Sequence, residues 1–181
     1  MPEASDEDLM ARVAQGDETA FRSLTERYVV RAVALARRFL GNSADAEDIA
    51  QDAFIAIWRA APRWQPSAAF GTWFYRIVVN LCLNHRRRRA FVPLEEAAEV
   101  ADGAPDAIER ILRSHEDRVL ALAVGALPER QRAAVLLTYW EGFSNARTAE
   151  ILDTSVSGVE TLLVRARRSL RARLGSVMGE E

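Results

Sequence analysis

The spacing of hydrophobic residues predicts helices along most of the chain. Between Glu18 and Leu40, apolar residues recur at steps of three and four, which places them on one side of a helix. No stretch shows the strict alternation of a half-buried strand. We therefore predict an all-α protein, with further helices over about 44–60, 70–89, 145–152 and 156–174.

Capping and turn residues divide this pattern into separate helices. Ser5 and Asp8 have the spacing of a capping box ahead of a short first helix. Gly16 interrupts the pattern before the second helix, and Gly41 is suited to end that helix. Pro128 fits the first turn of a helix in the C-terminal part. The helix boundaries should therefore follow these local signals.

The helix predicted over 70–89 has an unusual composition. Its sequence is FGTWFYRIVVNLCLNHRRRR, and residues 61–89 contain six arginines and no acidic residue. Arg76, Asn80 and Asn84 are four residues apart, so they share a face distinct from the apolar one. Amide and guanidinium groups can recognise base edges, and a cationic helix end can bind phosphate. A core helix with solvated arginines fits this stretch as well, so both interpretations stay open.

Charge is segregated along the chain, although the net charge is only −2. The net charge of Arg, Asp and Glu side chains is −4 over residues 1–60, +6 over 61–89, −6 over 90–117 and +2 over 118–181. The acidic block also contains proline and glycine, which is typical of a flexible linker. An ordinary solvated linker and a nucleic-acid mimic both fit it. We predict two small helical domains, 1–90 and 114–175, joined by an acidic linker, 91–113, and followed by a tail, 176–181.

The helix predicted over 44–60 has one face that mixes acids with large apolar groups. A free surface seldom combines isoleucine, tryptophan and several acids, whereas a protein interface does. The alternative is a solvated face whose tryptophan folds back onto the core. The residues of this face are Asp48, Gln51, Asp52, Ile55 and Trp58.

The C-terminal part has the layout of a helix-turn-helix. A short helix, a three-residue turn and a longer basic helix follow one another from 145 to 174. Side chains near the start of the second helix can contact bases in that geometry. An ordinary helical hairpin would have the same apolar spacing. The candidate base-contacting residues are Ser157, Gly158, Glu160, Thr161, Arg165 and Arg168.

Several other classes of protein are disfavoured. The single cysteine, Cys82, rules out an internal disulfide, and its apolar surroundings predict inert burial. No apolar run is long enough to span a bilayer, and residues 1–16 lack a signal-peptide core, so we expect a cytoplasmic protein without membrane insertion. His85 and His115 have no metal-ligand spacing around them, and no phosphate-binding glycine loop or nucleophile motif occurs. We predict no catalytic residue, metal or cofactor, and no enzymatic activity.

Two segments together resemble the extracytoplasmic-function sigma factors of bacterial RNA polymerase. DAEDIAQDAFIAIWRA followed by FGTWFYRIVVNLCLNHRRRR resembles their region 2. LPERQRAAVLLTYWEGFSNARTAEILDTSVSGVETLLVRARRSLRARL resembles their region 4. The resemblance covers nearly the whole chain outside the linker and the termini. It implies a non-enzymatic subunit that binds core polymerase and promoter DNA and is held inactive by an anti-sigma factor.

The resemblance also implies roles for individual residues. The mixed face of helix 44–60 corresponds to the family's docking surface for the coiled coil of the largest polymerase subunit, and the polymerase flap is a further expected contact. The loop Trp64–Ala69 corresponds to the part that holds a flipped base, and the final helix corresponds to the part that binds the −35 element. The expected −10 contacts are Trp64, Arg76, Asn80, Asn84, Arg86 and Arg87.

The chain departs from the family pattern in its helix-turn-helix. Glu160 stands where a basic residue is common, and Leu162 stands where arginine is common. In the preceding helix, Arg147 and Thr148 replace an acid and an isoleucine. The alternative function is a stand-alone helix-turn-helix regulator, which would bind DNA without core polymerase. That alternative leaves the mixed face of helix 44–60 without a role.

Overall fold

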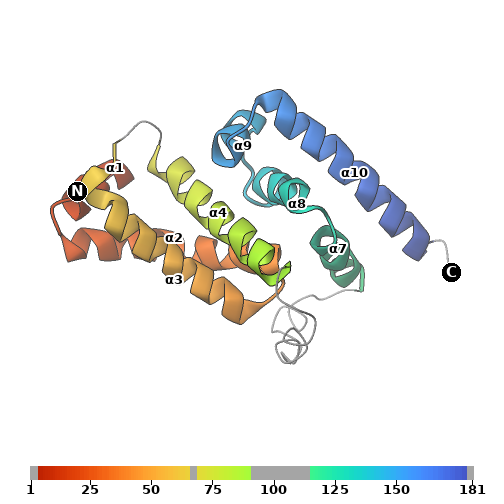
Figure 1. Cartoon of the computed structure of the whole chain (residues 1–181), viewed down its shortest axis with the longest axis horizontal. Coiled ribbons are helices and arrows are strands. Elements are labelled where there is room, and N and C mark those ends of the chain that lie inside the picture. Colours follow the sequence, from red (N-terminus) through yellow and green to blue (C-terminus); the bar gives the residue numbers. More distant parts are fainter. Residues whose placement is uncertain (1–3, 66–68, 91–114, 179–181) are drawn as a thin grey trace.

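The computed structural model describes residues 4–65, 69–90 and 115–178, and all regular elements within these ranges are helical (Figure 1). The predicted all-α class is confirmed. The predicted linker, 91–113, lies outside the described residues, as do 66–68 of the predicted loop. The helices are α1 (Asp6–Val13), α2 (Glu18–Leu40), α3 (Ser43–Ala60), α4 (Phe70–Ala90), α7 (His115–Gly125), α8 (Glu129–Val135), α9 (Asn145–Leu152) and α10 (Val156–Met178), with a 3₁₀ turn at Ala61–Arg63 and a π-helical turn at Leu136–Trp140.

Local caps set the ends of the first helices. Ser5 and Asp8 form the predicted capping box of α1. The Asp17 carboxylate accepts from the first backbone amides of α2, and Gly41 ends that helix with φ of 77°. This left-handed conformation is open to glycine without a Cβ penalty. The bounds of α2 are those that the sequence predicts.

The helices α1 to α4, which we call the N-terminal group, pack around aromatic and alanine side chains. The predicted inner face of α3 is buried, including Ile49, Ala53 and Ile57. The ring of Phe74 from α4 lies 5.9 Å from that of Phe54 on α3. The carboxylate of Glu7 on α1 accepts from the backbone amide of Phe70 at 3.0 Å, at the start of α4. The polar face of α4 is therefore held in a defined orientation by three other helices.

The helices α7 to α10, which we call the C-terminal group, include the predicted helix-turn-helix. Ser144 caps α9 by accepting from the amide of Arg147 at 3.2 Å. Asp153 follows α9 with φ of 49°, and Ser155 accepts from the amide of Gly158 in the first turn of α10. Both helices have the predicted bounds at the turn. Short polar residues thus make the sharp change of direction between α9 and α10.

The end of α8 differs from the regular helix that the sequence predicts. Leu136–Trp140 form a π-helical turn, in which the amide of Glu141 donates to the carbonyl of Leu136 at 3.0 Å. Tyr139 is 57% and Trp140 is 42% exposed. π-Helical turns of this kind occur inside α-helices and change the direction of the side chains that follow. Glu141, at the end of the turn, faces the N-terminal group.

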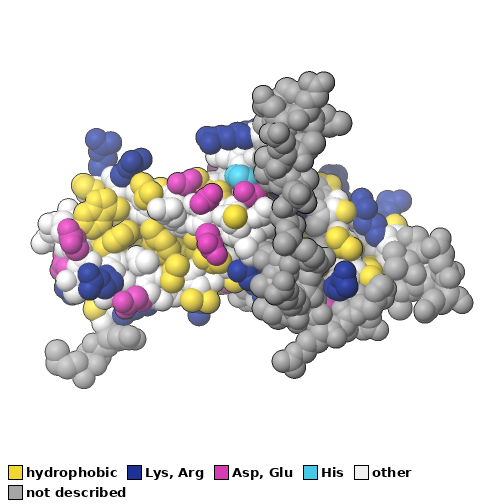
Figure 2. Space-filling model, turned by 90° about the horizontal axis from the view of Figure 1, so that it is seen from below, with side chains coloured by type: hydrophobic (Ala, Val, Ile, Leu, Met, Phe, Trp, Pro, Cys, Tyr) yellow, Lys and Arg dark blue, Asp and Glu magenta, His cyan; other side chains and the backbone are white. Residues whose placement is uncertain are grey.

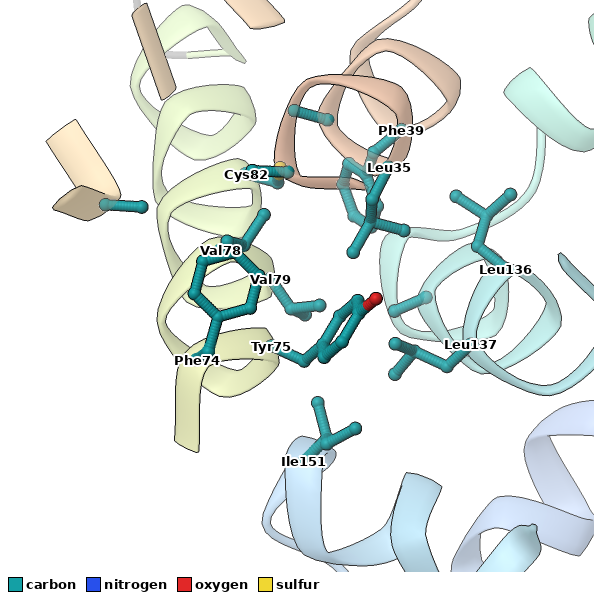
Figure 3. Close-up of a cluster of buried hydrophobic side chains, with 14 of the residues drawn as sticks. Leu35, Phe39, Phe74, Tyr75, Val78, Val79, Cys82, Leu136, Leu137 and Ile151 are labelled. Carbon is teal, nitrogen blue, oxygen red and sulfur yellow. The ribbon is translucent and has the colours of Figure 1, made fainter. Parts of the chain in front are cut away.

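The two groups share one hydrophobic core (Figure 3). Tyr75 and Val79 of α4 are buried together with Leu137 and with Ile151 of α9. The sequence predicts an apolar face on α4 that includes Phe74 and Val78, and this face is buried as well. α4 is therefore covered on two sides, by its own group and by the C-terminal group.

Arg132 of α8 also joins the two groups. Its side chain is 1% exposed, and its Nη1 donates to the carbonyl of Phe39 at the end of α2 at 2.6 Å. Its other nitrogens donate to carbonyls of Val124, Gly125 and Leu127 between α7 and α8. Burial and the nearby cation of Arg86 lower the pKa of Arg132 to about 10. The guanidinium thereby bonds to carbonyls at the ends of two helices, where fewer intrahelical donors are available.

Candidate nucleic-acid and protein interfaces

The mixed face of α3 lies at the surface of the molecule. We call Asp48, Gln51, Asp52, Ile55 and Trp58 the α3 face, and each is solvent-exposed. Figure 2 shows acidic side chains set among hydrophobic ones on the side of the molecule seen from below. The spacing of these residues brings them to one side of the helix.

Trp58 has features of both interpretations of this face, because its ring packs against the core and also stays accessible to a partner. Its ring meets that of Phe21 on α2 edge to face, with centroids 5.0 Å apart, yet the side chain stays 36% exposed. Ile55 is 40% exposed. The contact with Phe21 orients the indole in advance, so little conformational entropy is lost when a partner covers it. An apolar centre with acids around it suits a protein partner that offers an apolar patch and basic groups.

The polar face of α4 is partly open and partly engaged. Asn80, Asn84 and Arg87 are exposed. Arg76 donates through Nη2 to the carbonyl of Glu150 at 2.5 Å, and Arg86 lies 3.5 Å from the Glu129 carboxylate. The predicted residues therefore lie along one helix, but two of the arginines contact the C-terminal group.

A cleft of about 450 Å³ opens beside the start of α4. The rings of Trp64 and Trp73 lie in its wall with centroids 6.2 Å apart. Arg76 is part of this wall. So are Arg59 and Arg63, which were not predicted as DNA contacts from the sequence. Both arginines shortly precede Trp64 in the sequence, and this proximity is the signal that could have identified them as DNA contacts. Aromatic faces and guanidinium groups together suit an unstacked base and its phosphate.

The start of α10 presents the predicted base-contacting residues. Gly158 is half-buried, and the others are exposed, namely Ser157, Glu160, Thr161, Arg165 and Arg168. A shallow hollow of about 380 Å³ lies along this helix start. Arg130 of α8, which sequence reasoning missed, lines the hollow and donates to the carbonyl of Leu152 at 3.0 Å. The hollow thus combines hydroxyl groups with cations from two helices.

Three features of the described residues concern metal ligation, thiol reactivity and membrane insertion. No three His, Cys, Asp or Glu side chains converge to hold a metal ion in the part of the chain that the structure describes. Burial raises the pKa of the Cys82 thiol to about 12, so the thiolate is scarcely populated at neutral pH. Within the same residues, no helix is long and apolar enough to cross a membrane.

Known proteins match this chain over nearly its whole length. The family model "Sigma-70 region 2" matches residues 24–92, and "Sigma-70, region 4" matches residues 117–170. The ECF RNA polymerase sigma factor SigM of Mycobacterium tuberculosis is 36% identical over 176 residues, which cover 96% of this chain and 86% of SigM. The RNA polymerase sigma factor CnrH of Cupriavidus metallidurans is 33% identical over 183 residues, 96% of each chain.

A solved structure has the same arrangement of helices. The structure of CnrH in complex with the cytosolic domain of CnrY matches with a TM-score of 0.71 and 30% identity, and the match covers 96% of this chain and 99% of CnrH. The two family models match in the order in which the N-terminal and C-terminal groups follow one another.

Proposed function

The chain belongs to the sigma-70 family, as one of its extracytoplasmic-function sigma factors, and from this membership we propose how its surfaces act in transcription initiation. It is a specificity subunit of bacterial RNA polymerase whose activity an anti-sigma factor regulates. We assign region 2 to residues 1–90, the linker to 91–113 and region 4 to 114–175. Region 2 recognises and melts the −10 element, and region 4 binds the −35 element.

We assign core-polymerase binding to the α3 face. Ile55 and Trp58 supply an exposed apolar centre, and Asp48 and Asp52 supply the charge around it. Because the tryptophan ring already rests on Phe21, most of the interface can form without rearrangement. The partner surface is the coiled coil of the largest polymerase subunit, and region 4 contacts the polymerase flap.

We assign −10 recognition to the polar face of α4 and the cleft beside it. Asn80 and Asn84 are exposed and can hydrogen-bond base edges, while Arg87 can bind phosphate. Extruding a base from the stack costs a few kcal/mol. Stacking on an aromatic side chain contributes about 1–3 kcal/mol per base, so Trp64 and Trp73 in the cleft can offset that cost.

We assign −35 recognition to the start of α10. Arg165 and Arg168 are exposed on its outer side, and Ser157 and Thr161 lie one turn apart before them. A helix of this kind enters the major groove with its first turns towards the bases. Glu160 can accept a hydrogen bond from cytosine N4, which would distinguish this chain from relatives with a basic residue at that position.

The exposed α3 face is the main observation behind this proposal, because a stand-alone DNA-binding regulator does not need such a face. The test is binding to purified bacterial core polymerase, measured by fluorescence anisotropy of the labelled full chain. We expect Asp48→Ala combined with Trp58→Ala to weaken binding at least tenfold, since buried interface tryptophans are frequent hot spots. The matched control is Glu26→Ala combined with Val30→Ala, an exposed acid and an exposed apolar residue on α2.

Two outcomes would count against the proposal. Equal binding by the α3 variant and the control would remove the α3 face from the interface. Failure of the wild-type chain to bind core polymerase, together with tight promoter binding on its own, would favour the stand-alone regulator.

A further inference from the structure

The first turn of α1 holds three successive acids that bind to three different parts of the molecule. Asp8 belongs to the capping box of α1 itself and is exposed. Glu7 accepts a hydrogen bond from the backbone amide of Phe70 at 3.0 Å, at the start of α4. Asp6 accepts a hydrogen bond from the Tyr28 hydroxyl on α2 at 2.5 Å. The capping box therefore accounts for Asp8, whereas Asp6 and Glu7, which are half-buried, serve other helices.

Glu7 caps α4 from a distant part of the sequence. Ala69 directly precedes α4, and its carbonyl accepts from the amides of Thr72 and Trp73. Its methyl side chain cannot accept a hydrogen bond, and alanine is a poor N-cap residue. The Glu7 carboxylate binds the Phe70 amide, and its negative charge suits the positive end of the helix dipole. α1 thus supplies a cap that Ala69 cannot provide.

Asp6 fixes the aromatic side chain against which the start of α4 packs. Its other carboxylate oxygen accepts from Arg27 at 2.7 Å, so both oxygens are engaged. Burial and the Asp6 carboxylate raise the pKa of Tyr28 above its usual range, so the phenol stays protonated and can donate. The centroid of the Tyr28 ring lies 5.2 Å from that of Phe70 and 4.7 Å from that of Phe74. Tyr28 is therefore held at its hydroxyl group and along its ring.

These contacts extend to the wall of the cleft beside α4, which we call the tryptophan cleft. Phe70 is 0% exposed, and its ring centroid lies 6.0 Å from that of Trp73. Trp73 lines the cleft together with Trp64. α1 also contacts the 3₁₀ turn Ala61–Arg63, which directly precedes Trp64 (Figure 1). α1 therefore contacts both segments that bring a tryptophan to the cleft.

We propose that Asp6 and Glu7 are positioning residues for base capture in the tryptophan cleft. Glu7 acts through the Phe70 amide, and Asp6 acts through Tyr28. A cleft that is already formed binds an unstacked base with a smaller loss of conformational entropy than one that must first be ordered. The inference rests on the −10 function proposed for α4 and this cleft, and it adds α1 to the parts of the chain that determine promoter opening.

The test uses Glu7→Ala in the full chain, which removes the acceptor for the Phe70 amide. Glu7→Gln keeps an acceptor oxygen and removes only the charge. Tyr28→Phe keeps the ring and removes the hydroxyl group that Asp6 binds. The matched control is Glu18→Ala, which removes an exposed acid from the first turn of α2. Thermal unfolding of each variant measures any general loss of stability.

The assay measures capture of a single base by the holoenzyme formed from core polymerase and this protein. The probe is fluorescein-labelled single-stranded DNA with the non-template sequence of a promoter located by run-off transcription. A series of such strands carries an abasic site at each successive position of the −10 element, and anisotropy gives Kd for every strand. The base held in the cleft is the one whose removal makes the wild type and Trp64→Ala bind equally. Binding of each labelled variant to core polymerase is measured in parallel.

We expect Glu7→Ala to bind the intact strand about fivefold more weakly than the wild type, because loss of a helix cap weakens local structure by a factor of this order. On the strand that lacks the captured base, the two should bind equally. Glu7→Gln and Tyr28→Phe should show the same pattern with smaller losses, and Glu18→Ala should match the wild type. Binding to core polymerase should be unchanged throughout. A role in stability alone would weaken binding to every strand by the same factor.

Two results would overturn the inference. If Glu7→Ala binds the intact strand as tightly as the wild type, the carboxylate does not position the cleft. If its affinity falls equally for the intact and abasic strands, Glu7 affects only general stability. Should Glu7→Ala fail to fold, the same comparisons with Glu7→Gln and Tyr28→Phe decide the question. A different result concerns the proposed function: if no abasic position makes the wild type and Trp64→Ala equivalent, the cleft captures no base, and the inference fails with that assignment.

Discussion

Replacing Arg132 should destabilise the protein more than replacing any exposed arginine of the C-terminal group. The guanidinium donates to Phe39 at 2.6 Å, to Leu127 at 3.1 Å and to Val124 at 3.2 Å, and all three bonds are buried. Arg132→Met keeps a similar volume but leaves the carbonyls of Phe39 and Leu127 without this donor, while the Val124 carbonyl still accepts from the Leu127 amide at 3.1 Å. Each buried unsatisfied group costs about 1–3 kcal/mol. Relief of the desolvation that lowers the pKa of Arg132 offsets part of this loss.

The net loss should be about 3 kcal/mol, which lies in the lower half of the range of about 2–6 kcal/mol for two buried carbonyls. For a chain of this length, each kcal/mol lowers Tm by about 2–4 °C, so we expect a fall of about 6–12 °C. Thermal and urea unfolding followed by far-UV circular dichroism would measure it. Arg130→Met is the matched control, because Arg130 is exposed and donates to one carbonyl at 3.0 Å. An equal fall in Tm for both variants would show that water satisfies the carbonyls and that the buried bonds of Arg132 add no stability.

Three further results are expected. Arg165→Ala or Arg168→Ala should weaken promoter binding and reduce the slope of log Kd against log salt by about one unit, measured by anisotropy, because one phosphate contact is lost; an unchanged slope would place that arginine away from the DNA. The Cys82 thiol should resist a disulfide reagent at pH 8 in the folded chain and react once the chain unfolds, and fast reaction in the native state would contradict its burial. The free energy of unfolding should also fall above the ordinary thiol pKa of 9.0, because the folded state keeps the thiol proton up to about pH 12 while the unfolded chain loses it. Asp17→Ala should cost about 1 kcal/mol of unfolding free energy by removing the cap of α2, and a neutral effect would mean that the amides find water instead.

Helix bounds were predictable because the signals that set them are local. Asp17 and Gly41 delimit α2, and Ser144 and Asp153 delimit α9, where the sequence predicts. Each cap depends on residues within one turn of the helix end, so no long-range information is needed. The π-helical turn at Leu136–Trp140 lacks such a local marker, and the sequence predicts an ordinary helix there.

The docking of the two groups was not predictable from periodicity. An apolar residue such as Val79 indicates burial but does not identify what covers it. Arginine patterns have the same limitation. In the sequence Arg76, Arg86 and Arg132 all resemble solvated cations, yet Arg132 is buried and the other two contact the opposite group of helices. Their partners lie far away in the chain. For the α3 face, the residues indicate an unusual surface, tryptophan among acids on one side of a helix, but they do not decide between a partner surface and a solvated face.

Run-off transcription on fragmented bacterial genomic DNA, with core polymerase and with or without this protein, tests the sigma factor function most directly. We expect discrete transcripts that require the protein, with start sites that share two upstream elements. The Asp48→Ala/Trp58→Ala variant should lose these transcripts, and the Glu26→Ala/Val30→Ala control should retain them. Absence of any protein-dependent transcript, with no binding of the protein to core polymerase, would mean that the chain does not act as a sigma factor.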